Sequence, residues 1–466
     1  MKKHIAISAI VVGLLGSTNL CAAEELSSMF SEGKVSGQIR EYSISRTMDY
    51  SSSTKDDYTR SANAIGGHLK FETADYKGLS FGTAFYTTNG FLIPDDKAHT
   101  HSGGGTYSKI DPTLLGQDND GYSILGEVYL NFKYGNTAFK AGRQKLSTPM
   151  AGADDARMIP NLFEAYVLSN TDIPDTTLIV AHATKFAQGT FGRAYAGGAN
   201  AANTILSATA GYSAVDSRDQ VGDFVNMGTY VLGTATDGVS VLSATYTGIK
   251  NLKVQLWDYY AYDILNAIYG QVDYKWNCLI SDSVKPFVSA QIIKEDDVGD
   301  KLLKNLGGNG KIDSMYWGAK VGAKVENFTA YVAYSEVGNN SDTDEAYSNA
   351  IISPWGGMPA FTQGMVTRHV FLAGTKATKV AASYNWKAFG PDLKTVLYYA
   401  NYDMADNNGY TSDDASETGF DFIYKPSYVK NLNLRLRGNF ADDFNVNATG
   451  DTVGWNEYRF IANYNF

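Results

Sequence analysis

Apolar and polar residues alternate strictly along many segments of this chain. Between positions 432 and 440 one face carries Leu432, Leu434, Leu436, Gly438 and Phe440, while the other carries Asn433, Arg435, Arg437 and Asn439. The segments 65–72, 268–276 and 316–325 alternate in the same way. A period of two residues is typical of a β-strand with one apolar and one polar face. The pattern therefore predicts an all-β chain.

Eighteen such segments can be placed between turn signals. They are 34–46, 62–74, 78–88, 120–135, 137–146, 161–170, 175–186, 239–248, 252–262, 266–277, 283–294, 313–326, 327–337, 377–388, 391–403, 416–426, 430–441 and 454–466. A further candidate, 226–236, would break the alternation of short turns on one side with long loops on the other. Bacterial barrels have an even number of strands, so we place 226–236 inside a long external loop.

Aromatic residues decide between a soluble sandwich and a membrane barrel, because both alternate. Tyr and Trp recur at the ends of the apolar faces, at Tyr134, Tyr274, Trp276, Tyr384, Trp386 and Tyr424. Such placement is typical of the aromatic girdles of a transmembrane barrel. The last strand ends on Phe466, which resembles the signal that the barrel assembly machinery of bacterial outer membranes reads. We therefore predict an 18-stranded antiparallel transmembrane β-barrel with external loops that fold inward.

The amino terminus indicates export. Lys2 and Lys3 precede a short apolar stretch, and residues 21–23 offer a small-x-small cleavage site. We interpret 1–23 as a signal peptide and 24–466 as the barrel domain. Lipidation at Cys21 is the alternative, but Leu20 is a poor fit to the small residue that such signals need. The prediction is a bacterial outer-membrane protein in contact with membrane lipid and lipopolysaccharide.

Composition narrows the function. The chain has 466 residues, of which 19% are charged and 13% aromatic, and its 39 basic and 49 acidic residues give a net charge of −10. This balance disfavours a nucleic-acid partner, and two cysteines exclude a disulfide scaffold. The motifs of serine hydrolases, nucleotide-binding loops and zinc sites are missing. We therefore expect no enzyme activity and no cofactor.

One stretch resembles a known family. Residues 142–164 read GRQKLSTPMAGADDARMIPNLFE, which is similar to the segment around the third external loop in the OprD family of substrate-selective porins. The matching elements are 142–144, Leu146, 148–149, 154–155, Arg157, Pro160 and 163–164. The resemblance implies an 18-stranded monomeric or loosely trimeric barrel. It further implies that loop 147–160 folds into the pore, with help from loop 338–376, and that arginines on the wall guide carboxylate-bearing solutes.

The alternation of side chains between the two faces of each strand, which we call strand parity, places several cations on the wall of the lumen. Arg435, Arg437 and Arg459 lie on the polar faces of the last two strands, and Arg40 lies on the first strand, which would close against the last. Lys320 and Lys324 lie further along the wall. Charges in a narrow lumen select ions by attraction. The alternative is that these residues pair with acids and simply stabilise the barrel.

The loop expected to bend inward carries Asp154, Asp155 and Arg157. We predict that these residues lie at the constriction of the pore. Opposed acidic and basic walls there would impose a transverse field on acids and zwitterions. Arg143 stands at a strand end beside this loop. We expect it to anchor the loop through bidentate bonds to Asp154 or Asp155.

Other acidic and histidine residues are weak candidates for metal binding. These are His99 and His101, Asp118 and Asp120, and the group Asp342, Asp344 and Glu345. Their spacing fits no complete metal-binding motif, so we predict no metal site.

The leading hypothesis is a porin for passive diffusion of small hydrophilic solutes, anionic or zwitterionic. Two alternatives remain: an adhesive surface barrel whose loops matter more than its pore, and a barrel hydrolase.

Overall fold

The computed structural model describes residues 24–466 except 52–55, 93–98, 101–105, 117–118, 192–221, 340–345, 407–413 and 447–449. The predicted signal peptide, 1–23, lies outside the described residues. Within the described part, no helix is long and apolar enough to cross a membrane.

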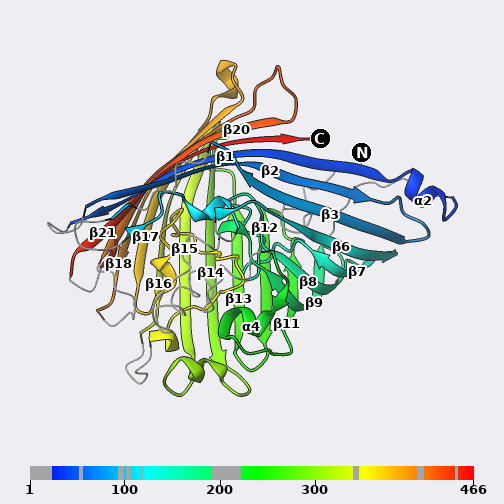
Figure 1. Cartoon of the computed structure of the whole chain (residues 1–466), viewed down its shortest axis with the longest axis horizontal. Helices are drawn as coiled ribbons and strands as arrows, with labels where there is room; N and C mark the ends of the chain where they lie inside the picture. The colour runs from blue at the N-terminus through cyan, green and yellow to red at the C-terminus, as the bar shows by residue number, and fades with distance from the viewer. Residues whose placement is uncertain are drawn as a thin grey trace.

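The chain forms a closed antiparallel barrel of eighteen strands, as predicted. The strands are β1 Lys34–Tyr50, β2 Tyr58–Glu72, β3 Leu79–Gly90, β6 Tyr122–Tyr134, β7 Thr137–Gln144, β8 Leu162–Asn170, β9 Thr176–Ala187, β11 Val239–Tyr246, β12 Leu252–Ala261, β13 Leu265–Lys275, β14 Val284–Asp297, β15 Asp313–Val325, β16 Phe328–Val337, β17 Lys376–Asn385, β18 Leu393–Asp403, β19 Ala415–Tyr424, β20 Leu432–Val446 and β21 Thr452–Asn465. Pairing of β1 with β21 closes the ring, and Figure 1 shows β1 beside β20 and β21.

Short elements lie before β1 and in the connections between these strands, and one of them, β10 (Val225–Asn226), pairs with the end of β9. They are α2 Ser28–Ser31, β4 His99–Thr100, β5 Thr106–Tyr107, η1 Pro112–Leu114, β10 Val225–Asn226, α4 Met227–Leu232, η5 Leu302–Leu306, η6 Ala346–Ser348, η7 His369–Phe371 and η8 Trp386–Phe389. The segment 226–236 is not a barrel strand, as expected, and its core is the helix α4. Figure 1 shows α4 at the loop end of the barrel and the β17–β18 turn at the opposite end.

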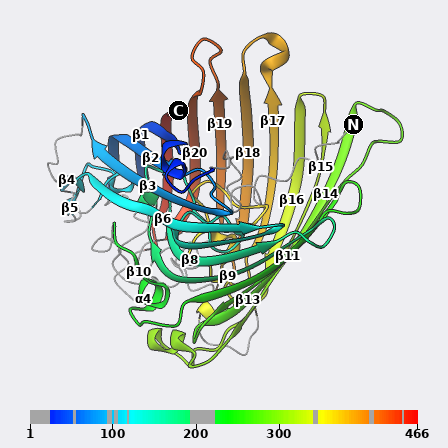
Figure 2. The same ribbon diagram turned by 90° about the vertical axis from the view of Figure 1, so that its right-hand side faces the viewer.

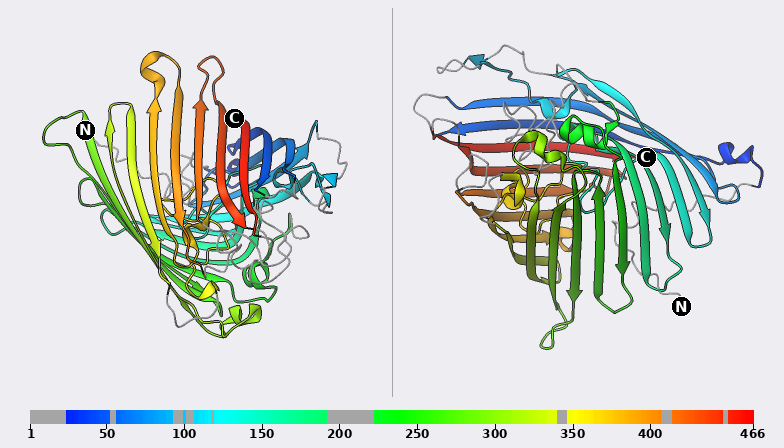
Figure 3. Two further views of the ribbon diagram at one scale, coloured as in Figure 1. Left: turned by 90° about the vertical axis from the view of Figure 1, so that its left-hand side faces the viewer. Right: turned by 90° about the horizontal axis from the view of Figure 1, so that it is seen from below.

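Long loops and short turns alternate along the barrel. We number the long loops L1 to L9 in chain order, so that L2 is 91–121, L3 is 145–161 and L7 is 338–375. The turns at the other end are short, as between β6 and β7 and between β15 and β16. Figure 2 shows β14 to β20 side by side as one wall, and Figure 3 shows the ring of strands from the side and from below.

The alternation of residues sorts side chains between lipid and lumen. Leu436, Phe460 and Val321 are 44%, 43% and 58% exposed on the outer face. Their neighbours Arg459 and Glu457 point inward and are almost fully buried. Phe466 follows β21, and its backbone exchanges hydrogen bonds with Gly37 of β1.

Candidate functional site

Register brings the predicted arginines together on one wall. Arg437 of β20 lies directly opposite Arg459 of β21, and Arg40 of β1 lies opposite Asn463 of β21. The three strands are neighbours, so the basic patch expected from parity exists. Lys320 and Lys324 lie on β15, five strands from β20.

Two of these arginines share one carboxylate. Arg435 makes a bidentate contact with Asp421 of β19, and the Nε of Arg437 lies 3.3 Å from the same carboxylate. The Asp421 side chain is 5% exposed, while Arg435 is 32% and Arg437 16% exposed. Two guanidinium groups that share one carboxylate leave one positive charge in excess. This charge lies on Arg435 and Arg437, whose side chains remain partly exposed on the lumen face.

A second carboxylate joins the wall to L3. Glu457 of β21 accepts a hydrogen bond from Arg157 Nη2 at 2.8 Å and contacts Arg459 Nε. Arg157 also donates to the hydroxyl of Tyr42 at 3.1 Å. The side chains of Arg157 and Glu457 are fully buried, and that of Arg459 is 2% exposed. Arg157 therefore fastens L3 to the wall and does not line the opening.

Asp155 makes the second link between L3 and the wall. It lies 2.6 Å from Arg40 Nη1, and Arg40 also donates to the backbone oxygen of Arg157 and to Asn463. Burial raises the pKa of Asp155, but the charge and hydrogen bond of Arg40 outweigh it and hold that pKa below its usual value. Acid and base thus meet in direct ion pairs where we expected them to face each other across the opening.

Asp154 points away from the arginines, towards L7. The backbone N–H of Gly357 lies 3.2 Å from both of its carboxylate oxygens. Burial raises the pKa of Asp154, because the charged form loses water that one backbone donor does not replace. Asp154 therefore joins L3 to L7.

L2 also enters the lumen, which the sequence did not indicate. Asp111 lies 2.9 Å from Arg46 Nη2 of β1, and both side chains are almost fully buried. Thr113 of η1 accepts a hydrogen bond from Arg157 Nε at 3.2 Å. The short helix η1 thus packs behind L3 and supports its buried arginine.

L7 crosses the lumen and is held by carboxylates at two walls. Glu417 of β19 accepts the N–H groups of Met365, Val366 and Thr367 at 2.6, 3.2 and 2.7 Å. Glu295 of β14 accepts the N–H of Ile352 at 2.8 Å. Both acids are fully buried, so they fix the backbone of the loop.

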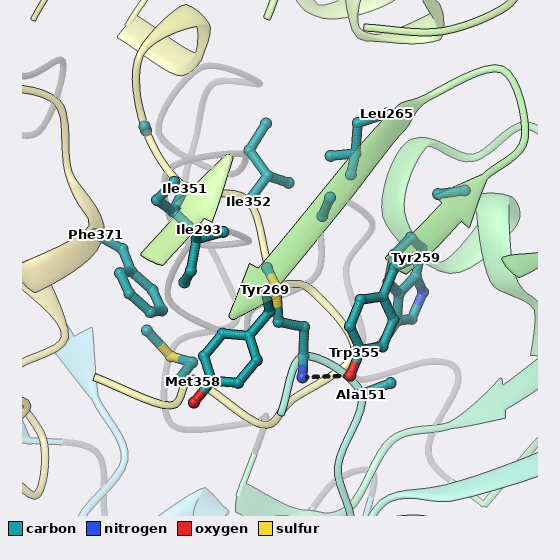
Figure 4. Packing of buried hydrophobic residues seen from close by; sticks show 14 of the residues in the cluster. Ala151, Tyr259, Leu265, Tyr269, Ile293, Ile351, Ile352, Trp355, Met358 and Phe371 are labelled. Atoms are coloured by element: carbon teal, nitrogen blue, oxygen red, sulfur yellow. Dashed lines mark hydrogen bonds between the residues drawn. The ribbon is translucent and has the colours of Figure 1, made fainter. Parts of the chain in front are cut away.

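Opposite the arginines, L3 and L7 pack on an apolar surface formed by β12 to β15. Figure 4 shows Trp355 and Met358 of L7 and Ala151 of L3 against Tyr259 and Tyr269 of the wall. The hydroxyl of Tyr259 accepts the N–H of Met150 at 3.3 Å. The two loops therefore fill one side of the lumen, and the charged groups gather on the other.

Two lysines face aromatic rings near L7. Lys320 Nζ lies 4.2 Å from the centre of the Phe361 ring, and Lys379 Nζ lies 4.4 Å from that of Tyr398. Lysine over an aromatic ring is a cation–π contact. Lys324 lies near the turn end of β15 and is exposed, so it stands away from L7.

The expected role of Arg143 is wrong. Gln144 takes the lumen-facing position on β7 and is 1% exposed, so Arg143 points to the outer face. There its Nε lies 3.8 Å from Glu164, and its guanidinium lies over the Phe224 ring. Arg143 therefore does not bind Asp154 or Asp155, which contact Gly357 and Arg40.

Most of the metal-binding candidates from the sequence fall outside the part of the chain that the structure describes. His101, Asp118, Asp342, Asp344 and Glu345 lie outside the described residues.

The family comparison accounts for this architecture. The model of the OprD family of outer membrane porins matches residues 29–466. The chain belongs to this family. It is therefore an outer-membrane protein, in accord with the predicted location and barrel fold. No curated protein matches the chain.

Solved structures agree on the fold of this OprD-family porin. Pseudomonas aeruginosa OpdK, solved with vanillate, has a TM-score of 0.68 at 15% identity, and the match covers 94% of this chain and 99% of that one. P. aeruginosa OccK9 gives 0.68 at 18% identity with the same coverage. A BenF-like porin from Pseudomonas fluorescens Pf-5 gives 0.69 at 15% identity, again over 94% and 99%.

Sequence reasoning missed the acids that organise the site. Glu457, Asp421 and Glu417 all occupy lumen-facing positions of strands that were predicted correctly. The same parity that selected Arg435 and Arg459 would have found them. Their partners in L3 and L7 depend on loop conformation, which carries no periodic signal.

Proposed function

We propose that this porin admits small carboxylate-bearing solutes by passive diffusion and that Arg435 and Arg437 guide them. The observation that carries the proposal is the charge balance of the arginine cluster. Among the described residues, the six guanidinium groups of Arg40, Arg46, Arg157, Arg435, Arg437 and Arg459 are paired with four carboxylates, those of Asp111, Asp155, Asp421 and Glu457. Two positive charges remain.

Accessibility divides the arginines predicted on the lumen wall into two groups. Arg40 and Arg459 are 6% and 2% exposed and are engaged in holding L3, so we assign them a positioning role. Arg435 and Arg437 keep 32% and 16% of their side-chain surface exposed, and the planar fork of Arg435, which Asp421 occupies, matches a carboxylate. A solute acid would compete with Asp421 for these two groups.

Lys320 extends the path along the opposite part of the wall, whereas Lys324, at the exposed turn end of β15, lies away from this path. Lys320 beside Phe361 offers a cation next to an apolar face, which suits a solute with a carboxylate and a compact body. Related porins support this chemistry, since OpdK was solved with vanillate and P. aeruginosa OccK2 with glucuronate.

Conductance and solute influx test the proposal together. Purified protein should give stepwise currents in planar bilayers, and proteoliposomes should swell faster in benzoate than in neutral benzamide. Absence of stepwise current would contradict the channel itself. Equal swelling rates in the two solutes would contradict the selectivity while leaving the channel intact.

A further inference from the structure

The outer wall of β13 to β15 has a polar edge on the side of the loops. Register places Asn266, Asp296 and Asp313 in one row of the sheet, and all three point outward. Lys294 Nζ lies 2.8 Å from Asp296 and 2.5 Å from Asp313. Hydrocarbon offers no partners to such groups, so the apolar, lipid-facing band of this sector begins at this row and extends towards the turns.

β15 spans this band completely. After Asp313 its outward residues are all apolar, namely Met315, Trp317, Ala319, Val321, Ala323 and Val325. Positions two residues apart, at about 3.3 Å per residue and a tilt of about 40°, give this series a height of roughly 25 Å. That is about the height of the apolar band in barrels of this kind. On β15 the band therefore ends where the strand ends.

β13 is too short to span the same band. Between Asn266 and the end of the strand its outward residues are Ile268, Gly270, Val272 and Tyr274. The further outward positions that would match β15 fall in the β13–β14 turn, 276–283. This turn must therefore carry the part of the apolar band that β13 lacks.

The first residues of the β13–β14 turn continue the outer wall. Cys278 N–H donates to the backbone oxygen of Val284 at 3.1 Å, so pairing with β14 extends past the end of β13. Val284 lies opposite Val325, which places Cys278 in the row where the band ends on β15. The ring centres of Tyr274 and Trp276 lie 5.6 Å apart with the rings stacked. Trp276 thus keeps the outward direction of the strand.

The tip of the same turn is apolar and fully exposed. Leu279 and Ile280 are 101% and 95% exposed, more than any other large hydrophobic residue in the described part of the chain. Adjacent aliphatic side chains are unfavourable in water. The β15–β16 turn, which follows a strand with a complete band, has Glu326 and Asn327 instead. The two turns are therefore suited to different surroundings.

We propose that the β13–β14 turn is embedded in the periplasmic leaflet of the outer membrane, where Leu279 and Ile280 contact the acyl chains of phospholipid next to the headgroups. Short turns of such barrels lie on the periplasmic side, and this turn is continuous with the wall that faces lipid. The β15–β16 turn ends in the aqueous phase. The embedded turn fixes the depth of this sector in the membrane, whichever solute the channel carries.

Fluorescence quenching at Cys278 tests the depth of the turn. Cys278 is the free cysteine in the described part of the chain, and it is labelled with bimane before the protein is reconstituted into phosphatidylethanolamine liposomes. Phospholipid with a nitroxide near the headgroup end of its acyl chain should quench this label several-fold more than iodide supplied on both sides. The matched control is Glu326→Cys/Cys278→Ser, at the exposed β15–β16 turn, where the order of the two quenchers should be reversed.

Removing the apolar tip separates its role from that of the label. Leu279→Ser/Ile280→Ser should reduce quenching of bimane at Cys278 by nitroxide lipid several-fold and increase quenching by iodide. Heat-modifiable migration on gels shows that each variant is folded.

Three results would overturn the proposal. One is quenching by nitroxide lipid at Cys278 no stronger than at Glu326→Cys, which would place the turn in water. Another is a label that neither quencher reaches, which would show that protein covers the turn. The third is a quenching pattern that Leu279→Ser/Ile280→Ser leaves unchanged, because the apolar tip would then not hold the turn in lipid.

Discussion

Glu457 shows how one buried acid links the lumen wall to L3. It forms ion pairs with Arg157 of L3 and with Arg459 of β21, and all three side chains are almost fully buried. Removing one member of such a group leaves uncompensated buried charge, which costs about 3–5 kcal/mol.

We predict that Glu457→Gln lowers the thermal midpoint of unfolding and raises single-channel conductance, because Arg157 loses the carboxylate that holds L3. Differential scanning calorimetry and planar-bilayer recording would measure the two effects. Glu326→Gln, at the β15–β16 turn, is the matched control and should change neither quantity. Unaltered conductance in Glu457→Gln would show that the pair does not fix L3.

At this scale the sequence predicts which residues face the lumen but not what they bind. Parity alone placed Arg435, Arg437, Arg459 and Arg40 on one wall, because a strand fixes side-chain direction every second residue. Their partners come from loops folded across the lumen, and strand pattern carries no information about that path. Arg143 was misplaced because it precedes an inward loop, yet strand parity still directs it outward.

L3 and L7 act as one element because they approach each other very closely. Gly357 has φ +99°, and a Cβ there would lie 2.2 Å from the backbone oxygen of Pro149. Gly357 also presents its N–H to Asp154. A side chain at this position would force the two loops apart.

We therefore expect Gly357→Ala to widen the opening, seen as higher conductance and faster uptake of bulky acids in liposome swelling. Gly450→Ala is a suitable control, because Gly450 also has a positive φ but no atom lies near its added Cβ. If Gly357→Ala and Gly450→Ala behave alike, the close contact does not limit the pore.

L7 also contains a buried histidine whose protonation opposes folding. Burial lowers the pKa of His369 to about 4, and its Nε2 lies 2.8 Å from the backbone oxygen of Phe444. An unfolded chain binds this proton near pH 6.5, so stability falls as the pH drops from about 6.5 towards 4. By pH 5 the loss amounts to about 2 kcal/mol.

The expected outcome is that His369→Gln reduces the difference between the thermal midpoints measured at pH 7.5 and pH 5. Gln keeps a donor for the Phe444 oxygen but does not titrate. An unchanged difference would mean that His369 contributes nothing to the acid sensitivity of the protein.

At the level of elements, strand positions were predictable and loops were not. Every barrel strand lies within a few residues of its predicted bounds, and parity correctly excluded 226–236. The strands are set by a local period of two. The inward path of L2 depends on contacts with distant residues, among them Arg46 with Asp111 and Arg157 with Thr113, which no local pattern encodes.

Over the whole molecule, net charge and local charge have opposite signs. The chain carries −10 overall, yet the arginine cluster on the lumen wall has two positive charges beyond its paired acids. Fields in a narrow lumen with low-dielectric walls depend on the nearby groups. The barrel concentrates cations on one part of the lumen wall.

The reversal potential across a potassium benzoate gradient in planar bilayers tests this account most directly. The wild-type channel should favour the anion. Arg435→Gln/Arg437→Gln should reduce the benzoate-to-potassium permeability ratio several-fold, while Lys324→Gln, at the exposed turn end of β15, should change it far less. A double variant with the wild-type reversal potential would contradict the claim that these two arginines select the solute.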